Sequence, residues 1–330
     1  MKTRLILIKS MLFTALAISS YQATALNIVL SNDDGWSSIG IQAMKAALVA
    51  GNHNVFLVAP LDEQSGSSAA INTNALEVIK QRGSADEGAH EYSVALAGGQ
   101  EGAEPATTAA LGVGIVQQAI GVEPDLIVSG INAGQNLGAA AQISGTVGGA
   151  LAAINSALAG GQIPGLAIST DNICNDDSAT CHDANAAHYD RVAGFTADLI
   201  EKLSKNRTEL MPQGIGLNIN YPALETVNGV MVSRQGRTLT IGGQPISITF
   251  GCFDDCSNVE IGTAVPAGIT GFAPLDLAEI KNADTTNNAN GYITIVPIEA
   301  DYTTGVTGRN NSVIKNFIQK IERIVKSMEF

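Results

Sequence analysis

Short apolar runs alternate with stretches of helical periodicity through the first half of the chain. The runs are rich in Val, Ile and Leu, which predicts buried strands at 27–30, 54–60, 125–132 and 165–169. Between them, apolar or small residues recur at helical spacing, which predicts helices at 39–50, 105–120 and 146–160. Buried strands that alternate with helices favour an α/β fold, so we predict a doubly wound, mostly parallel sheet.

Outside these segments the pattern predicts three further elements. A hairpin is expected within 72–100, with its turn at 83–88. Residues 228–261 are β-rich, and 313–328 show the apolar spacing of a surface helix packed on the core. We therefore divide the mature chain into an α/β core at 26–225 and a β-rich extension with a C-terminal helix at 226–330.

The first 25 residues have the pattern of a secretory signal peptide. Three basic residues precede an apolar stretch at 11–19, and Ala23-Thr-Ala25 supplies the small residues of a cleavage site. A membrane anchor is the alternative, but the apolar stretch is shorter than the ~20 residues that a spanning helix needs. We expect an exported protein, periplasmic or extracellular, with no membrane segment once this peptide is removed.

The mature chain is strongly acidic. The full sequence of 330 residues has a formal charge of −13, and removing the three basic residues of the signal peptide takes it to −16. Proteins that bind nucleic acid polymers use basic patches, so this charge argues against such a partner. A small phosphorylated ligand is compatible with it, provided that a metal ion and backbone N–H groups bind the phosphate locally.

The four cysteines form two close pairs in acidic, polar segments, Cys174 with Cys181 and Cys252 with Cys256. In an exported protein such pairs favour local disulfides, and of the three possible connectivities we expect the sequential one. Zinc is the alternative, but neither pair has the usual spacing or the neighbouring histidines of a zinc site. We expect two disulfides that staple loops.

Asp33 and Asp34 directly follow the first predicted strand and precede Gly35. Two adjacent carboxylates repel each other, and either is costly to bury without a counter-charge. A divalent cation relieves both problems, and carboxylate oxygens suit Mg²⁺, Mn²⁺ or Ca²⁺. Asn, Asp and Gly also dominate ordinary turns, so this segment taken alone favours a polar turn.

Three further segments lie beyond the carboxyl ends of predicted strands, where ligands bind in doubly wound sheets. They are the loop at Ser65, the strand end at Asn132 and the helix start at Ser144-Gly145-Thr146. Ser, Thr and Gly are ordinary helix caps, but hydroxyls and unpaired N–H groups at a helix N-terminus also bind anions. A cation site and an anion site at one edge of the sheet are what hydrolysis of a phosphate ester requires.

Five ordered blocks of this sequence resemble the SurE survival-protein family of nucleotidases. The blocks are LSNDDG at 30–35, VAP and QSG at 58–66, VSGINAGQN with SGT at 128–146, LNINYP at 217–222 and GYITIVP at 291–297. Together they span most of the mature chain. The resemblance implies a Rossmann-like core, a C-terminal extension that makes contacts in a homodimer or homotetramer, and a metal-dependent phosphatase acting on nucleoside 5′- and 3′-monophosphates.

The same resemblance assigns roles to individual residues. One divalent metal ion, Mg²⁺ or Mn²⁺ before Ca²⁺, would bind Asp33, Asp34, Ser65 and Asn132. The phosphate would bind Asn136, Ser144, Gly145 and Thr146. We expect in-line attack by a metal-activated water that Asp33 or Asp34 orients or deprotonates. A nucleophilic Ser65 would need a histidine partner, and no histidine lies in a matching block, so we expect the histidines at the surface or in loops.

The surroundings of these residues depart from the family pattern. Gln64 replaces a frequent Arg, Leu61 replaces an acidic or amide residue, and acidic residues and an aromatic are missing between Asn136 and Ser144. A broad-specificity exported acid phosphatase is therefore an alternative activity. Phosphatases that form a phospho-aspartate have Asp-x-Asp after the first strand, whereas these carboxylates are contiguous. A non-catalytic exported binding protein of the same fold is a further alternative, which the retention of four predicted metal ligands opposes.

Overall fold

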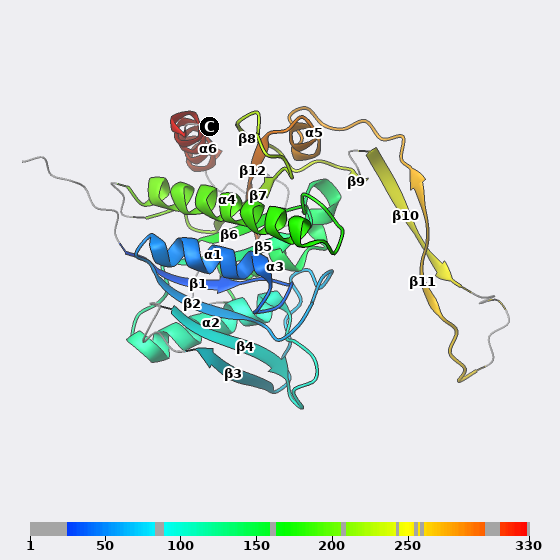
Figure 1. Ribbon diagram of the computed structural model, residues 1–330, viewed down its shortest axis with the longest axis horizontal. Coiled ribbons are helices and arrows are strands. Elements are labelled where there is room, and N and C mark those ends of the chain that lie inside the picture. The colour runs from blue at the N-terminus through cyan, green and yellow to red at the C-terminus, as the bar shows by residue number, and fades with distance from the viewer. Residues whose placement is uncertain are drawn as a thin grey trace, which may run out of the picture.

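The computed structural model describes residues 25–82, 89–158, 163–205, 209–241, 244–253, 257, 261–300 and 311–328. Residues 1–24, which make up the predicted signal peptide except for its last residue, lie outside the described residues. Within the described residues, nine strands form one sheet in the order β3-β4-β2-β1-β5-β6-β7-β12-β8 (Figure 1). The strands are β1 (Asn27–Ser31), β2 (Asn54–Pro60), β3 (Leu76–Arg82), β4 (Ala89–Leu96), β5 (Leu126–Ala133), β6 (Gly165–Thr170), β7 (Ile215–Tyr221), β8 (Val230–Val232) and β12 (Ile293–Glu299).

The sheet is mostly parallel, as predicted. Strands β4, β2, β1, β5, β6 and β7 run parallel to one another in that order. At one edge β3 pairs antiparallel with β4, and at the other β12 pairs antiparallel with β7 and parallel with β8. Because β8 and β12 come from 226–330, the C-terminal segment supplies one edge of the core sheet.

Helices cover both faces of the sheet, and alternation along each strand decides which face a side chain meets. In β1, Ile28 and Leu30 pack into one buried cluster with α1 (Ile39–Ala50) and α4 (Ala179–Ser204). Val29 lies between them in sequence but packs into another cluster, with α2 (Pro105–Ile120) and α3 (Gly145–Ile154). This two-sided burial confirms the doubly wound arrangement. The carboxyl ends of the parallel strands all lie at the same end of the sheet.

Three predicted elements have the observed bounds, and β1, β5 and β6 differ from the prediction by one residue at one or both ends. α1, α2 and β2 begin and end at the predicted residues, and β3 pairs with β4 as the predicted hairpin, whose turn at 83–88 lies outside the described residues. α3 differs, because it ends at Ile154 rather than at 160. The side chain of Asn155 accepts the N–H of Ala157 at 2.9 Å, and this local turn competes with further helix.

The remaining helices are η1 (Gly138–Gln142), a short 3₁₀ segment, α5 (Asp284–Ala289) and α6 (Asn311–Ser327). α6 confirms the helix predicted at 313–328, and it packs on the core through Phe317, Ile321 and Val325. In the part of the chain that the structure describes, no helix combines the length and the apolar character that crossing a bilayer requires.

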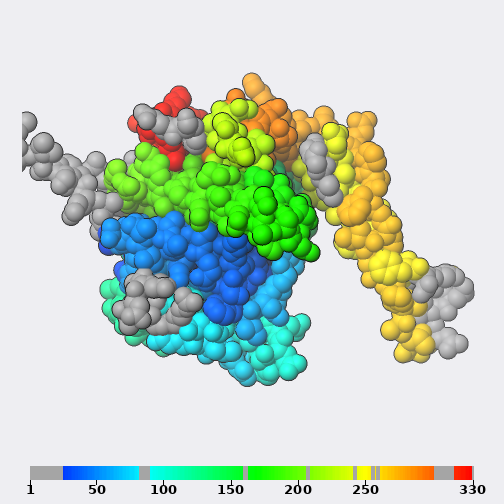
Figure 2. Space-filling view, viewed as in Figure 1, coloured from blue at the N-terminus to red at the C-terminus, as the bar shows by residue number. Residues whose placement is uncertain are grey.

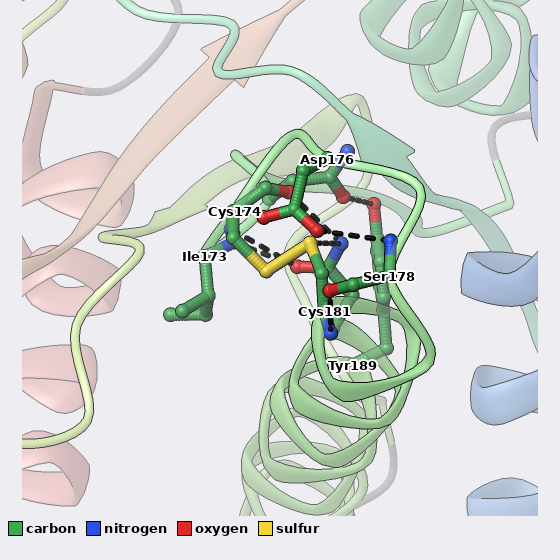
Figure 3. The surroundings of a disulfide bond; sticks show 8 residues. Ile173, Cys174, Asp176, Ser178, Cys181 and Tyr189 are labelled. Carbon is green, nitrogen blue, oxygen red and sulfur yellow. Dashed lines mark hydrogen bonds between the residues drawn. A yellow bond between two sulfur atoms is a disulfide. The ribbon is translucent and has the colours of Figure 1, made fainter.

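The long helix α4 has no counterpart among the predicted helices. Ser178 caps it by accepting the N–H of Cys181 at 3.1 Å, and Val192 and Leu199 bury its inner side. The predicted disulfide joins Cys174 to Cys181, with their Cα atoms 5.7 Å apart (Figure 3). The prediction that both cysteines lie in loops is wrong, because Cys181 lies in the first turn of α4.

The same disulfide decides the zinc alternative for this pair. The carboxylate of Asp176 lies within 4.8 Å of both sulfur atoms, so the three groups are close enough to share an ion. Cysteines joined in a disulfide offer no thiolate, however, and thiolates are the ligands that zinc needs here. The second predicted disulfide involves Cys256, which lies outside the described residues.

A three-stranded sheet extends from the body of the molecule (Figures 1 and 2). It pairs β9 (Leu239–Ile241), β10 (Gln244–Cys252) and β11 (Ala267–Pro274) antiparallel, with β10 in the middle. We call β10 and β11 the arm. Large apolar side chains on the arm are open to solvent, since Phe250 is 73% exposed and Phe272 57% exposed.

Candidate functional site

The two adjacent carboxylates lie at the carboxyl end of β1, at the edge of the sheet where doubly wound folds bind ligands. Asn32 shapes the turn that carries them, because its Nδ2 donates to the carbonyl of Gly35 at 3.0 Å and to Oγ of Ser38 at 2.8 Å. Asp33 is 2% exposed and Asp34 is half-buried. Both carboxylates therefore lie within the fold rather than on a solvated turn.

Asp33 is held by the first turn of α3. Its Oδ1 accepts the hydroxyl of Thr146 at 2.5 Å, and its Oδ2 accepts the N–H of Thr146 at 3.1 Å. The free N–H groups and the positive dipole end of a helix N-terminus stabilise a negative charge. In this structure, part of the predicted anion site thus binds a carboxylate of the protein itself, which brings α3 against the end of β1.

Asp34 connects the ends of β1 and β5. Its Oδ2 accepts the N–H of Ala133, the last residue of β5, at 2.9 Å. The neighbouring Asn132 is buried, and its Nδ2 donates to the carbonyl of Gly134 at 2.6 Å. Its Oδ1 has no hydrogen-bond partner among the described residues. A buried amide oxygen without a partner needs a physical explanation, and binding a cation is one.

The loop that carries Ser65 lies against the same turn. The N–H of Gln64 donates to the carbonyl of Asp33 at 2.7 Å, which fixes the loop beside the carboxylate pair. The N–H of Ser65 donates to Oε1 of Glu63 at 2.7 Å, and Ser65 itself is exposed. The structure thus brings the predicted ligand loop next to Asp33, while the role of the Ser65 hydroxyl stays a prediction.

The carboxylates share one electronegative environment. Burial raises the pKa of Asp33, and the hydrogen bonds from Thr146 oppose the shift. Burial and then the charge of Asp33 raise the pKa of Asp34 to about 7, against the N–H of Ala133. Glu63 adds a weaker repulsion to both groups. The sequence pattern left Glu63 unassigned, although its place in the predicted ligand loop is the signal that could have found it.

The remaining predicted phosphate ligands lie on the segment between β5 and α3. Asn136 is buried, its N–H donates to Oδ1 of Asn220 at 2.7 Å and its Nδ2 donates to Oγ of Ser169 at 2.8 Å. Ser144 is the N-cap of α3, because its Oγ accepts the N–H of Val147 at 3.0 Å. Both side chains therefore have structural partners, and phosphate binding by them stays a prediction.

Gly145 places the backbone of α3 directly beside the site. A Cβ atom added to it would lie 2.9 Å from Oδ2 of Asp33 and 2.8 Å from Oγ of Ser67. Such distances are shorter than real Cβ contacts, so a glycine is needed for this close approach. Oγ of Ser67 is buried and has no hydrogen-bond partner among the described residues. The structure thus brings Asp33, Gly145 and Thr146 together as neighbours.

The expectation that the histidines lie at the surface or in loops is wrong for His188, which lies on α4 and has no exposed surface. His53 is also buried, at 6% exposed, but it lies in the loop between α1 and β2. Nε2 of His188 lies 2.7 Å from Oγ1 of Thr170, and Nη2 of Arg191 lies 3.4 Å from Nδ1 of His188. Because a guanidinium can only donate, Nδ1 is the acceptor and Nε2 carries the proton that it donates to Thr170. Burial and then the charge of Arg191 lower the pKa of His188 to about 4. His188 is therefore a neutral, structural histidine at neutral pH.

The donor set at the end of β1 fits a hard divalent cation. Asp33, Asp34 and Asn132 offer carboxylate and amide oxygens from two neighbouring strand ends, and Ser65 offers a hydroxyl from the adjoining loop. Among the described interactions, neither carboxylate is paired with a basic side chain. A cation would offset the cost of burying two neighbouring negative charges and would give Oδ1 of Asn132 a partner.

Comparison with known proteins gives this geometry a context. Residues 28–241 match the family model described as Survival protein SurE. A protein of Caulobacter vibrioides named 5′-nucleotidase SurE is 33% identical over 218 residues, which cover 64% of this chain and 70% of that protein. A protein of the same name from Actinobacillus pleuropneumoniae is 30% identical over 281 residues, which cover 84% of this chain and 95% of that protein.

A solved structure supports the same relationship. The crystal structure of the SurE protein from Aquifex aeolicus aligns with a TM-score of 0.59 and 25% sequence identity, covering 90% of this chain and 99% of that one. The region matched by the family model runs from β1 to β9 and includes all eight predicted metal and phosphate ligands. The chain therefore belongs to the Survival protein SurE family.

Proposed function

We propose that this protein is a metal-dependent phosphomonoesterase that hydrolyses nucleoside 5′- and 3′-monophosphates to nucleoside and phosphate. The observation that carries the proposal is the buried, unpartnered Oδ1 of Asn132 beside the carboxylates at the end of β1. It occurs in a member of a family whose compared relatives are named 5′-nucleotidases. An oxygen-lined cation site next to a helix N-terminus suits phosphate-ester hydrolysis.

Asp33, Asp34, Asn132 and Ser65 would hold one divalent cation, and their oxygen donors suit Mg²⁺ or Mn²⁺. When bound, the cation would neutralise charge on the phosphoryl oxygens and lower the pKa of the attacking water. Thr146 fixes Asp33 through both carboxylate oxygens. Oδ1 of Asp34 accepts no described hydrogen bond, so we assign to Asp34 the task of orienting the attacking water and taking its proton.

The first turn of α3 would bind the phosphoryl oxygens. Among the described hydrogen bonds, the N–H of Thr146 donates to Asp33 and the N–H of Val147 donates to Ser144. The N–H of Gly145 has no such partner, which leaves it for the substrate. Asn136 lies on the segment that leads into this turn. Its backbone N–H donates to Asn220 and one N–H of its side-chain amide donates to Ser169, so we expect the second N–H of that amide to face the phosphate.

The proposal is tested by phosphate release from adenosine 5′- and 3′-monophosphate, polyphosphate and an aryl phosphate. We expect release from both nucleotides with Mn²⁺ or Mg²⁺, loss of release to background after dialysis against EDTA, and recovery when the cation is returned. The loss follows because the carboxylates that hold the cation have no other described counter-charge. Release that is unchanged by EDTA, or no release from any substrate with any cation, contradicts the proposal.

One observation favours a broader acid-phosphatase specificity as the second candidate. Gln64 stands where the family often carries Arg, and its Nε2 donates to Oδ1 of Asp62 at 3.0 Å. The ligand loop therefore brings no positive charge from this position to a nucleotide phosphate. Hydrolysis of the aryl phosphate with a kcat/KM equal to that of the nucleotides would favour this candidate, whereas a clear preference for nucleotides would favour the first.

We also propose that the arm pairs with a second copy of this chain in a homodimer or homotetramer. An isolated two-stranded ribbon is marginally stable in water, yet β10 and β11 extend away from the body (Figure 2). Large apolar side chains on them are open to solvent. Phe250, Phe253 and Phe272 are 73%, 60% and 57% exposed. Phe250 lies in β10, Phe272 lies in β11 and Phe253 directly follows Cys252 at the end of β10. Several exposed aromatic groups on one projecting part of a protein favour an association surface.

Sedimentation analysis tests the association. We expect the unmodified chain to sediment as a dimer or larger, and the double variant Phe250→Ser/Phe272→Ser to sediment as smaller species, because it removes two exposed anchors. Val122→Ser is the matched control, since Val122 is 50% exposed but lies on the body. A monomeric unmodified chain, or an assembly that the double variant leaves intact, contradicts the proposal.

A further inference from the structure

The segment from Gly134 to Ser144 links the end of β5 to the start of α3 and carries Asn136. At Gly138, side chains from the C-terminal third of the chain bind this segment through hydrogen bonds. The N–H of Gly138 donates to both carboxylate oxygens of Asp284, at 3.2 and 3.1 Å. The carbonyl of Gly138 accepts Nε2 of Gln235 at 2.9 Å. Both sides of this residue are thus bound by side chains roughly 100 or more positions away in the sequence.

The neighbouring backbone is bound in the same way. The N–H of Ala139 donates to the carbonyl of Thr238, the residue before β9, at 3.1 Å. A Cβ atom at Gly138, where φ is +52°, would lie 2.2 Å from that carbonyl oxygen. No side chain fits between Gly138 and the backbone of Thr238, so the two backbones are in direct contact.

Asp284 is the central acceptor of these hydrogen bonds. It has no exposed surface, and it accepts the N–H of Gly236 at 2.8 Å and of Thr285 at 2.8 Å besides that of Gly138. A buried carboxylate is costly unless its oxygens are hydrogen-bonded, and here backbone N–H groups from three segments satisfy it. The side chain of Asp284 therefore connects the segment from Gly134 to Ser144, the backbone at Gly236 and α5.

The inner side of the same segment is bound to β7. The carbonyl of Asn136 accepts Nδ2 of Asn218 at 2.9 Å, and the N–H of Asn136 donates to Oδ1 of Asn220 at 2.7 Å. Two side chains of β7 therefore fix Asn136, and Asp284 binds the same segment two residues later, at Gly138. Both attachments hold the segment that carries Asn136.

We propose that Asp284 is a positioning residue for phosphate binding, acting through Gly138 on Asn136 and on the first turn of α3. The inference rests on the proposed function of the site. Asp284 touches no predicted metal ligand, so its loss is expected to weaken phosphate binding while leaving cation binding intact. Misplacing a binding group by a fraction of an ångström is enough to cost affinity when the group must meet a small rigid anion.

The test compares Asp284→Asn with Asp125→Asn. Asp125 is the control for the loss of a carboxylate that accepts a backbone N–H, that of Asn27 at 2.7 Å; unlike Asp284 it is exposed, and it lies just before β5, at the amino ends of the parallel strands. Calorimetry with inorganic phosphate in the presence of Mn²⁺ gives a Kd that needs no turnover. We expect Asp284→Asn to raise that Kd and the KM for nucleotide about tenfold, with kcat within about threefold of the unmodified protein.

Two further measurements separate positioning from general instability. The Mn²⁺ concentration for half-maximal activation is expected to stay unchanged in Asp284→Asn, and hydrogen exchange is expected to quicken in the peptide 134–146. If Asp284→Asn does not fold, Gln235→Ala decides, since it removes only the side chain that binds the carbonyl of Gly138. We expect a phosphate Kd raised about threefold in that variant, as for loss of one hydrogen bond.

The outcomes distinguish the two proposals. An unmodified protein that binds phosphate but releases none from any ester overturns the proposed function alone. Phosphate affinity that is unchanged in a folded Asp284→Asn protein, or lowered equally in Asp125→Asn, overturns the positioning role. No phosphate binding by the unmodified protein in the presence of Mn²⁺ overturns it as well.

Discussion

Asp34→Asn is expected to lower kcat/KM for a nucleoside monophosphate by at least about a thousandfold, equivalent to ~4 kcal/mol of transition-state stabilisation. The substitution keeps the shape of the side chain and still allows the contact with Ala133, whose N–H lies 2.9 Å from Oδ2. It removes the charge that would hold the cation and the base that would take the proton of the attacking water. Steady-state phosphate release at saturating Mn²⁺ measures the effect.

The control for this variant is Asp125→Asn. Asp125 accepts the N–H of Asn27 at 2.7 Å, so both substitutions replace a carboxylate that accepts a backbone N–H, but Asp125 is exposed and lies just before β5, at the amino ends of the parallel strands. We expect the control to retain activity within about twofold, as for substitutions distant from a site. Turnover within tenfold of normal in Asp34→Asn would exclude the assigned role of Asp34, as would an equal loss in the control.

Gly145→Ala is expected to lower kcat/KM about a hundredfold. The new Cβ would lie 2.9 Å from Oδ2 and 3.0 Å from Cβ of Asp33, so either the carboxylate or the first turn of α3 must move. Either movement breaks the pair of hydrogen bonds between Thr146 and Asp33 that fixes the carboxylate. Kinetics, together with a titration of cation affinity, will show the displacement as weaker cation binding and slower turnover.

Gly194→Ala is the matched control for this substitution. Gly194 lies in α4, where an added Cβ has nothing within 4 Å. Alanine lowers the conformational entropy of the unfolded chain and favours helix, so we expect this control to gain roughly 0.5 kcal/mol of stability with normal activity. Normal cation affinity and turnover in Gly145→Ala would show that α3 can retreat from Asp33 without consequence, contrary to the geometry described above.

The elements of the core could be predicted because their signals are local. α1, α2 and β2 have the predicted bounds, since apolar spacing and flanking turn residues mark them within a dozen residues. α4 carries a weaker signal, because polar residues fill about half of its 26 positions and only Val192, Leu199 and similar side chains bury one side. Its helix is stabilised by packing on α1 and β-strands that are distant in sequence, so tertiary contacts decide it.

Part of the candidate site could be predicted in the same way. The position of Asp33 and Asp34 at a strand end follows from the apolar run before them, and the loop at Gln64 does lie against Asp33. The partners of the carboxylates do not follow from any local pattern. Thr146 and Ala133 are 113 and 99 positions away from them, and the order of strands in the sheet is what makes them neighbours.

The sequence by itself determined that this chain forms alternating buried strands and helices, that a carboxylate pair ends the first strand, and that the chain resembles one family. These conclusions depend on local spacing and on ordered blocks, which survive without knowledge of contacts. Only the tertiary structure decided that Asp33 is bound by α3, that His188 is buried and that Asp284 accepts the N–H of Gly138, which lies 146 positions away in the sequence. The physical reason is that hydrogen bonds and burial depend on which segments meet in space, and packing of the whole sheet sets those meetings.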